Sequence, residues 1–255
     1  MPFMFVGHGS PMNAIEDNVF SRNWSAMGRK VPRPSAILCV SAHWLTPGST
    51  QVLATDVPRT IHDFGGFPAE LYEKRYPAPG APDHAEKTIA LIRKAEAIAD
   101  YSRGLDHGTW SVLIRMYPEA DIPTYQLSID YAQPPQYHYE LAQDLRALRD
   151  HGVLVIGSGN LVHNLHALRV GAAPFDWAEE FDQRMAGLIT AGDDAGVVDF
   201  LRMGPIARLA HPTHDHFLPL IYALGLRGQR DAIEYFNDEV VMSSVSMRSI
   251  VARPA

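Results

Sequence analysis

Twelve histidines and a single cysteine define the side-chain chemistry that this chain of 255 residues offers. Histidine is the commonest metal ligand in proteins and the usual acid or base near neutral pH. A chain rich in histidine and poor in cysteine that needs a metal will therefore favour imidazole and oxygen ligands over thiolates. Because surface histidines are common, their positions in the sequence must decide whether they share a site.

Three histidines come at or just after the end of a short apolar run. His8 stands in Gly-His-Gly-Ser-Pro, His43 stands in Ser-Ala-His-Trp, and His163 follows Gly-Ser-Gly-Asn by a few residues. Ligands of open α/β sheets bind outside the carboxyl ends of the strands. Glycines beside such ends let the backbone turn sharply and approach a ligand. A loop or packing role is the simpler interpretation for any one histidine, but the three together indicate one shared site.

A dense group of donors follows late in the chain, where His211, His214 and His216 lie within six residues, with Asp215 among them. Two histidines that are two residues apart cannot share a helix face. We therefore expect one of the three to point into the shared site and the others to belong to a solvated loop.

Two further segments have the composition of a substrate pocket. Residues 60–68 mix aromatic side chains, paired glycines and polar groups, which suits a slot for a flat ring. Residues 105–110 precede an apolar segment with a helical pattern, so Thr109 is a candidate helix cap and His107 could face the site. A purely structural role is the alternative for both segments.

The elements that must position these residues alternate along the chain. Short apolar runs bounded by Gly, Pro or Ser predict buried strands, and apolar residues at helical spacing predict helices. Such alternation predicts one α/β domain over residues 1–255, with a central mixed, largely parallel sheet flanked by helices. The expected strands are Phe3–Val6, Ala36–Val40, Thr124–Ile129 and Val153–Ile156, with edge or mixed strands near Val52–Ala54, Ile233–Phe236 and Val245–Val251. The expected helices are His84–Ala99, Tyr137–Asp150, Asp176–Ala191, Asp194–Arg202 and His216–Leu224.

Composition excludes several classes of protein. The chain is 46% hydrophobic and 20% charged, which is typical of a globular protein with a sizeable core. Its net charge of −7 argues against general nucleic-acid binding, and its apolar runs are too short to span a membrane. The start of the chain lacks the pattern of a secretory signal, so we expect a cytoplasmic protein. The lone Cys39 lies in an apolar run and is expected to be an inert core thiol.

Other catalytic patterns are missing from the sequence. It contains no P-loop, no dinucleotide-binding fingerprint and no His-Glu-x-x-His pair. The Gly-Ser-Gly at 157–159 lacks the glycine spacing of a nucleophile elbow.

Six motifs occur in an order that resembles a known family: GHGSPMNAI, SAHW, HDFGGFP, DHGTW, GSGNLVHNL and HxHFLPL. Together they are similar to the class III extradiol ring-cleavage dioxygenases, and specifically to their 4,5-DOPA dioxygenase branch. The resemblance covers nearly the whole chain. It implies a single α/β domain that opens a catechol ring with dioxygen at one mononuclear Fe(II), although zinc occurs in some members.

The resemblance also assigns residues. It implies that His8, His43 and His216 are the metal ligands, whereas protocatechuate-type enzymes have a glutamate at the third position. His163 matches the acid/base residue and could be a fourth ligand of a zinc-bound form, and His107 is the reserve acid/base candidate. The candidate residues for substrate binding are Ser10, Trp44, Asp63 and Phe64.

Two alternatives from other classes remain at this point. Three histidines and a water would serve a zinc hydrolase equally well. A binding protein that retains a disused metal site would show the same residues. Consumption of oxygen with a catechol discriminates the dioxygenase from both, and the sequence leaves the oligomeric state and the particular catechol undetermined.

Overall fold

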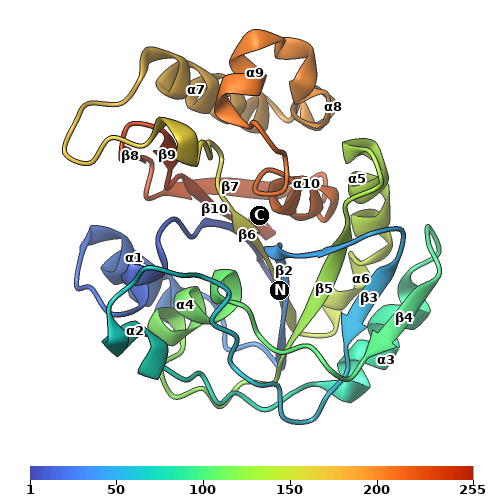
Figure 1. Cartoon of the computed structure of the whole chain (residues 1–255). Coiled ribbons are helices and arrows are strands. Elements are labelled where there is room, and N and C mark those ends of the chain that lie inside the picture. Colours follow the sequence, from blue (N-terminus) through green and yellow to red (C-terminus); the bar gives the residue numbers. More distant parts are fainter. Residues whose placement is uncertain (255) are drawn as a thin grey trace.

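A mixed sheet of eight strands forms the centre of the molecule (Figure 1). The computed structural model describes residues 1–254. The strands of this sheet are β1 (Phe3–Gly7), β2 (Ala36–Thr46), β3 (Thr50–Leu53), β4 (Ala97–Asp100), β5 (Thr124–Asp130), β6 (Val153–Gly159), β7 (Asp231–Phe236) and β10 (Ser249–Pro254). Their order is β4-β3-β5-β2-β6-β1-β10-β7, and the inner strands β5, β2, β6 and β1 are parallel. Antiparallel pairing of β3 with β5 and of β10 with β1 makes the sheet mixed.

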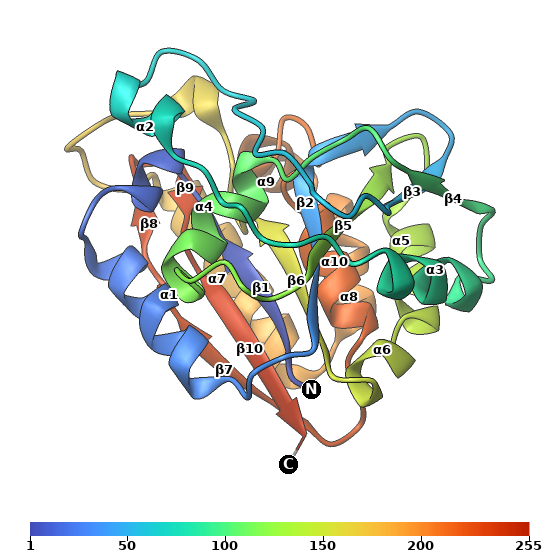
Figure 2. The same cartoon turned by 90° about the horizontal axis from the view of Figure 1, so that it is seen from below.

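Helices cover both faces of the sheet. They are α1 (Val19–Lys30), α2 (Ala69–Glu73), α3 (Pro82–Leu91), α4 (His107–Met116), α5 (Pro135–Asp144), α6 (Ala147–Asp150), α7 (Asp176–Ala191), α8 (Asp194–Val198), α9 (Pro205–Ala210) and α10 (Leu218–Gly225). Helix α4 packs on β2 and β6 beside α1, whereas α10 packs on β6, β1 and β2 from the opposite face (Figure 2). A short ribbon of β8 (Val240–Val241) and β9 (Val245–Ser246) lies outside the main sheet.

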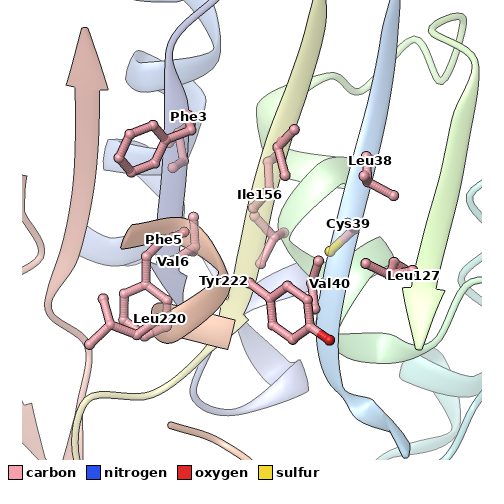
Figure 3. Close-up of a cluster of buried hydrophobic side chains, with 14 of the residues drawn as sticks. Phe3, Phe5, Val6, Leu38, Cys39, Val40, Leu127, Ile156, Leu220 and Tyr222 are labelled. Carbon is pink, nitrogen blue, oxygen red and sulfur yellow. The ribbon is translucent and has the colours of Figure 1, made fainter. Parts of the chain in front are cut away.

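The core lies between the central strands and the helices. Every residue of β1, β5 and β6 is buried, as is usual for parallel strands covered on both faces. Figure 3 shows Phe5 of β1 near Leu220 of α10, in a cluster to which Tyr222 of α10 and residues of β2, β5 and β6 also contribute. Cys39 is buried in this cluster, as expected, and burial raises the pKa of its thiol far above the usual range.

The predicted fold class is confirmed, because the sheet is largely parallel and lies between layers of helices. The prediction of one helix over His84–Ala99 is wrong, since α3 ends at Leu91 and residues 97–100 form β4. The backbone N–H groups of Arg93 and Lys94 donate to the Asp144 carboxylate, at 2.8 and 3.0 Å. In a continuing helix these two N–H groups would donate to backbone carbonyls, so their hydrogen bonds to the distant Asp144 side chain end the helix.

Other boundaries differ by less. The segment 137–150 is divided into α5 and α6, and 194–202 into α8 and a 3₁₀ turn, Phe200–Met203. The last predicted helix starts at Leu218 rather than His216, and residues 245–251 contribute to two separate strands. Helices α1, α2 and α9 were not predicted. No helix in residues 1–254 combines the length and apolar character that crossing a bilayer requires.

Candidate active site

A cavity of about 390 Å³ opens beside the carboxyl ends of the parallel strands. Five histidines from distant parts of the chain line it: His8, His43, His107, His163 and His216. Ligand sites of α/β sheets are expected at this edge. Its remaining lining is mainly apolar and includes a single carboxylate, that of Asp63.

The end of β6 brings two of these histidines together. The backbone N–H of His8 donates to the Gly159 carbonyl at 2.9 Å, and the N–H of Asn160 donates to the His216 carbonyl at 2.9 Å. A Cβ atom on Gly159 would lie 2.2 Å from the His216 carbonyl oxygen. A glycine is therefore required here for the segment before α10 to approach the strand so closely.

His43 lies inside β2, not beyond its end as the sequence pattern predicted. The strand continues to Thr46, and its pairing register with β5 shifts between Val40 and Leu45. Such a bulge redirects the side chains within it. In this way a residue in the interior of a strand reaches the cavity.

The prediction that Trp44 binds substrate is wrong. Its side chain is 3% exposed and belongs to the hydrophobic core, and the Arg103 guanidinium lies 5.6 Å from its ring centre. Successive residues of a strand point to opposite faces, so His43 and Trp44 cannot both enter the cavity.

Three imidazoles form a compact triangle in the cavity. The ring centres of His8 and His43 are 5.0 Å apart, those of His8 and His216 are 5.2 Å apart, and those of His43 and His216 are 4.9 Å apart. The Nε2 atoms of His8 and His43 are only 3.2 Å apart.

Ser158 fixes the orientation of the His8 ring. Its hydroxyl donates to the Gly108 carbonyl at 2.5 Å, and its oxygen lies 3.0 Å from Nδ1 of His8. Because the serine proton is used on the carbonyl, the serine oxygen accepts from Nδ1–H. This arrangement leaves a lone pair on Nε2 of His8.

Carboxylates lie near Nδ1 of the other two rings, where Ser158 lies for His8. Nδ1 of His216 lies 2.5 Å from an oxygen of Asp215, and Nδ1 of His43 lies 3.5 Å from Asp63. Ligating histidines usually give their second nitrogen to such an outer partner, which fixes the tautomer. All three rings thus have an oxygen of an outer partner near Nδ1.

The donor set fits a metal cation. Burial, with a smaller contribution from neighbouring histidines, lowers the pKa of His8 and of His43 well below the usual range, so both rings are neutral at pH 7. The Nε2 atoms of the two rings lie only 3.2 Å apart inside the cavity. A cation between them could be bound by both nitrogens.

Two further histidines flank the triangle. The His163 ring stacks on His216 at 3.5 Å between ring centres, with 7° between their planes. Burial and the nearby His216 lower the pKa of His163 to about 2. On the other side His107 lies 3.9 Å from His43 between ring centres, and its backbone N–H donates to Asp63 at 2.9 Å. Both rings therefore line the cavity beside the triangle.

Of the remaining predicted residues, Ser10, Asp63 and Phe64 line the cavity. Of the late cluster, His216 alone lines it, as the spacing suggested, because His214 stacks on Tyr131 and His211 is buried against Leu161. The predicted cap at Thr109 is wrong, since Asp106 caps α4 and accepts from the Thr109 N–H.

Sequence reasoning missed most of the apolar wall of the cavity. Phe67, Pro11 and Leu165 stand in motifs or segments that the sequence singled out, but none of them was predicted to line the cavity, and no motif contains the other three members: Leu168, Met242 and Val245. These side chains come from loops and from the β8–β9 ribbon, where neither spacing nor composition marks a site.

Ser158→Ala tests the outer partner of His8. Without the serine oxygen, Nδ1 of His8 loses its acceptor and the ring loses its fixed tautomer, so metal affinity should fall roughly 10–100-fold, the usual effect of losing an outer-shell partner. Titration with Zn(II) against a competing chelator measures this change. The control is Ser128→Ala, which removes a buried strand hydroxyl that contacts Gln51 and Thr46 instead. Equal affinity in both variants would contradict the assigned role.

The fold and the cavity together define an α/β protein with a histidine-rich pocket that is suited to one metal ion. Comparison with known proteins then identifies the family. Residues 2–252 match the model of the catalytic LigB subunit of aromatic ring-opening dioxygenase. A protein of Escherichia coli K12 named 4,5-DOPA dioxygenase extradiol is 44% identical, covering 98% of this chain and 94% of its own length. A protein of Beta vulgaris with the same name is 40% identical, covering 92% of this chain and 90% of its own length.

A solved structure agrees with these sequence matches. The crystal structure of an uncharacterized protein of Escherichia coli K12 superimposes with a TM-score of 0.85 at 37% identity, covering 98% of this chain and 99% of that one. The chain therefore belongs to the LigB family and is an aromatic ring-opening dioxygenase. The family supports a single metal ion in the cavity, and so does the group of His8, His43 and His107, whose candidate ligand atoms lie within 4.8 Å of one another.

Proposed function

We propose that the protein is an Fe(II)-dependent extradiol dioxygenase that opens the ring of a catechol with dioxygen. DOPA-like catechols are the first substrates to test, because the relatives from E. coli and Beta vulgaris are named for that activity. The observation that carries the proposal is the triangle of His8, His43 and His216, each with an oxygen of an outer partner near Nδ1. These three residues would hold the metal.

Bound Fe(II) would lower the pKa of the catechol hydroxyls and supply the redox chemistry for reaction with dioxygen. Three protein ligands leave open positions for both reactants. The chain itself would orient the ring. Phe64 lines the cavity beside His107, 5.5 Å away between ring centres, and offers an aromatic edge to a flat substrate. Ser10 presents a hydroxyl on the same wall, and Asp63 holds His107 in place.

A catechol has two hydroxyl protons, and the second needs a base in the pocket. His163 is neutral at pH 7 and lines the cavity, so its ring can accept this proton and later return it. A neighbouring catecholate would favour the protonated imidazole and so increase its basicity. His107 is the reserve candidate, because it lines the opposite side of the triangle.

The choice of metal separates this proposal from a zinc hydrolase on the same ligands. Protein loaded anaerobically with Fe(II) should consume oxygen when a catechol and air are added, and a yellow ring-opened product should form. Zinc-loaded protein should bind the catechol without turnover, because zinc does not change its oxidation state. An oxygen electrode and visible spectra follow both reactions, with chelator-treated protein as the control. Equal activity with zinc and iron would contradict the proposal.

Zinc could also occupy the site in a resting form, with His163 as a fourth ligand. Cytoplasmic location and the lack of nucleic-acid binding remain predictions. A free buried thiol such as Cys39 suits a reducing compartment. Cell fractionation and a nucleic-acid retention assay would test these two predictions.

A further inference from the structure

Apart from the histidines, the lining of the cavity is mostly apolar. Six hydrophobic residues from three separate segments form an apolar wall: Phe64, Phe67, Leu165, Leu168, Met242 and Val245. Leu165 and Leu168 are 56% and 38% exposed, so two leucines stand uncovered at the margin of the pocket. A ligand that reaches from the histidines to this margin would remove both from water.

The same wall offers nothing that would bind a carboxylate. Among the described residues that line the cavity, none is a lysine or an arginine. The one acidic group, Asp63, already accepts from the His107 backbone at 2.9 Å and lies 3.5 Å from Nδ1 of His43. Its negative charge would oppose a second carboxylate in the pocket.

Arginines near the cavity contact other groups. Arg169 follows Leu168, and its guanidinium lies 4.2 Å from the ring centre of Phe175. Arg103 donates to the His43 carbonyl at 2.6 Å, and its guanidinium lies 5.6 Å from the ring centre of Trp44. Arg115 donates to the carbonyls of Asn13 and Glu16, at 3.0 and 2.9 Å. Moving Arg103 or Arg115 toward a ligand would break these hydrogen bonds.

We infer that the catechol taken by this enzyme carries an uncharged, apolar substituent, which lies against Leu165, Leu168 and Met242. The inference rests on the proposed function and narrows its substrate class. An amino-acid side chain such as that of DOPA would place a carboxylate on an apolar wall without a counter-ion, and burying such a group without a partner is unfavourable. An alkyl substituent instead gains about fourfold in affinity for each methylene that it buries.

A series of substituted catechols tests the inference on the Fe(II)-loaded full chain. The members are catechol, 4-methyl-, 4-ethyl- and 4-propylcatechol, 3-(3,4-dihydroxyphenyl)propanoate, dopamine and L-DOPA. We expect kcat/KM to rise with alkyl length by about fourfold per methylene. The propanoate, which is close to 4-propylcatechol in size, should be at least roughly tenfold poorer, as should L-DOPA, because the carboxylate is desolvated without a partner. Calorimetry with zinc-loaded protein should give the same order of affinities without turnover.

Two variants at one position provide the matched control. Leu168→Arg adds a cation at the exposed margin, and Leu168→Gln adds polarity without charge. The arginine should improve the propanoate relative to 4-propylcatechol by roughly tenfold or more, because hydrogen bonds to charged groups are the stronger ones. The glutamine should not produce this change of preference.

The outcomes separate the two proposals. Turnover of alkylcatechols in preference to the charged compounds supports the inference. If L-DOPA, the propanoate or dopamine is preferred, the inference is overturned while the dioxygenase function stands. If Fe(II)-loaded protein consumes no catechol, including the unsubstituted one, the proposed function fails and the inference fails with it.

Discussion

Replacing His43 or His8 by alanine should reduce bound metal from about one ion per chain to a trace and abolish oxygen uptake. Each change removes one of the three imidazoles that meet in the cavity. The loss should therefore exceed the roughly 10–100-fold effect of removing an outer partner such as Ser158. Elemental analysis after iron loading measures the metal, and circular dichroism checks that the fold is retained.

The control for these variants is His151→Ala. His151 is exposed at the end of α6, and metal content should stay normal when it is replaced. His62, His84 and His138 should likewise be dispensable for metal, because none lines the cavity. Normal metal content in both the His8 and His43 variants would refute the ligand assignment.

His163→Gln should keep the iron and bind the catechol, but lower the rate of ring opening by about 10²–10⁴-fold, the usual contribution of a general acid or base. Glutamine is similar in length to histidine but cannot take up a proton at neutral pH. Single-turnover rates, measured beside metal analysis on the same preparation, report the chemical step separately from metal loading.

Two results would change the role of His163. A fall in metal content comparable to that of the His43 variant would make it a structural ligand, in agreement with its stacking on His216. If the His163→Gln enzyme is active and the His107→Gln enzyme is inactive, His107 and not His163 is the base. His107 has a ready-made orienting partner in Asp63, whose oxygen lies 3.1 Å from its Nδ1.

Much of the fold followed from local sequence patterns. The central strands are continuous apolar runs because both of their faces are covered, and such runs are distinctive when glycine or proline bounds them. The pattern could not place the end of α3, because an alternation of alanine and isoleucine suits a helix and a strand alike. The Asp144 carboxylate accepts hydrogen bonds from the backbone N–H groups that follow α3, and these bonds end the helix. Asp144 lies about 50 residues further along the chain.

The same distinction between local and distant information applies to the site. His8 and His163 were placed near the strand ends by their flanking glycines, and both line the cavity. Trp44 does not line the cavity because it follows His43 within β2, and the local sequence does not show that this strand continues to Thr46 through its pairing with β5. The apolar wall was missed for a similar reason, because Leu168 and Met242 are brought together only by the tertiary fold.

The position of β10 has a consequence for the timing of assembly. This strand pairs with β1, so that Phe3 lies opposite Ala252 and nearly the whole described chain separates two neighbouring strands. Pairings between residues so distant in sequence form slowly, after local helices and hairpins. β1 ends at Gly7, directly before His8, and its parallel pairing with β6 places Phe3 opposite Val155 and Gly7 opposite Gly159. His8 therefore reaches the other histidines only through a pairing that spans more than half of the chain, and we expect the metal site to form late in folding, after the local helices.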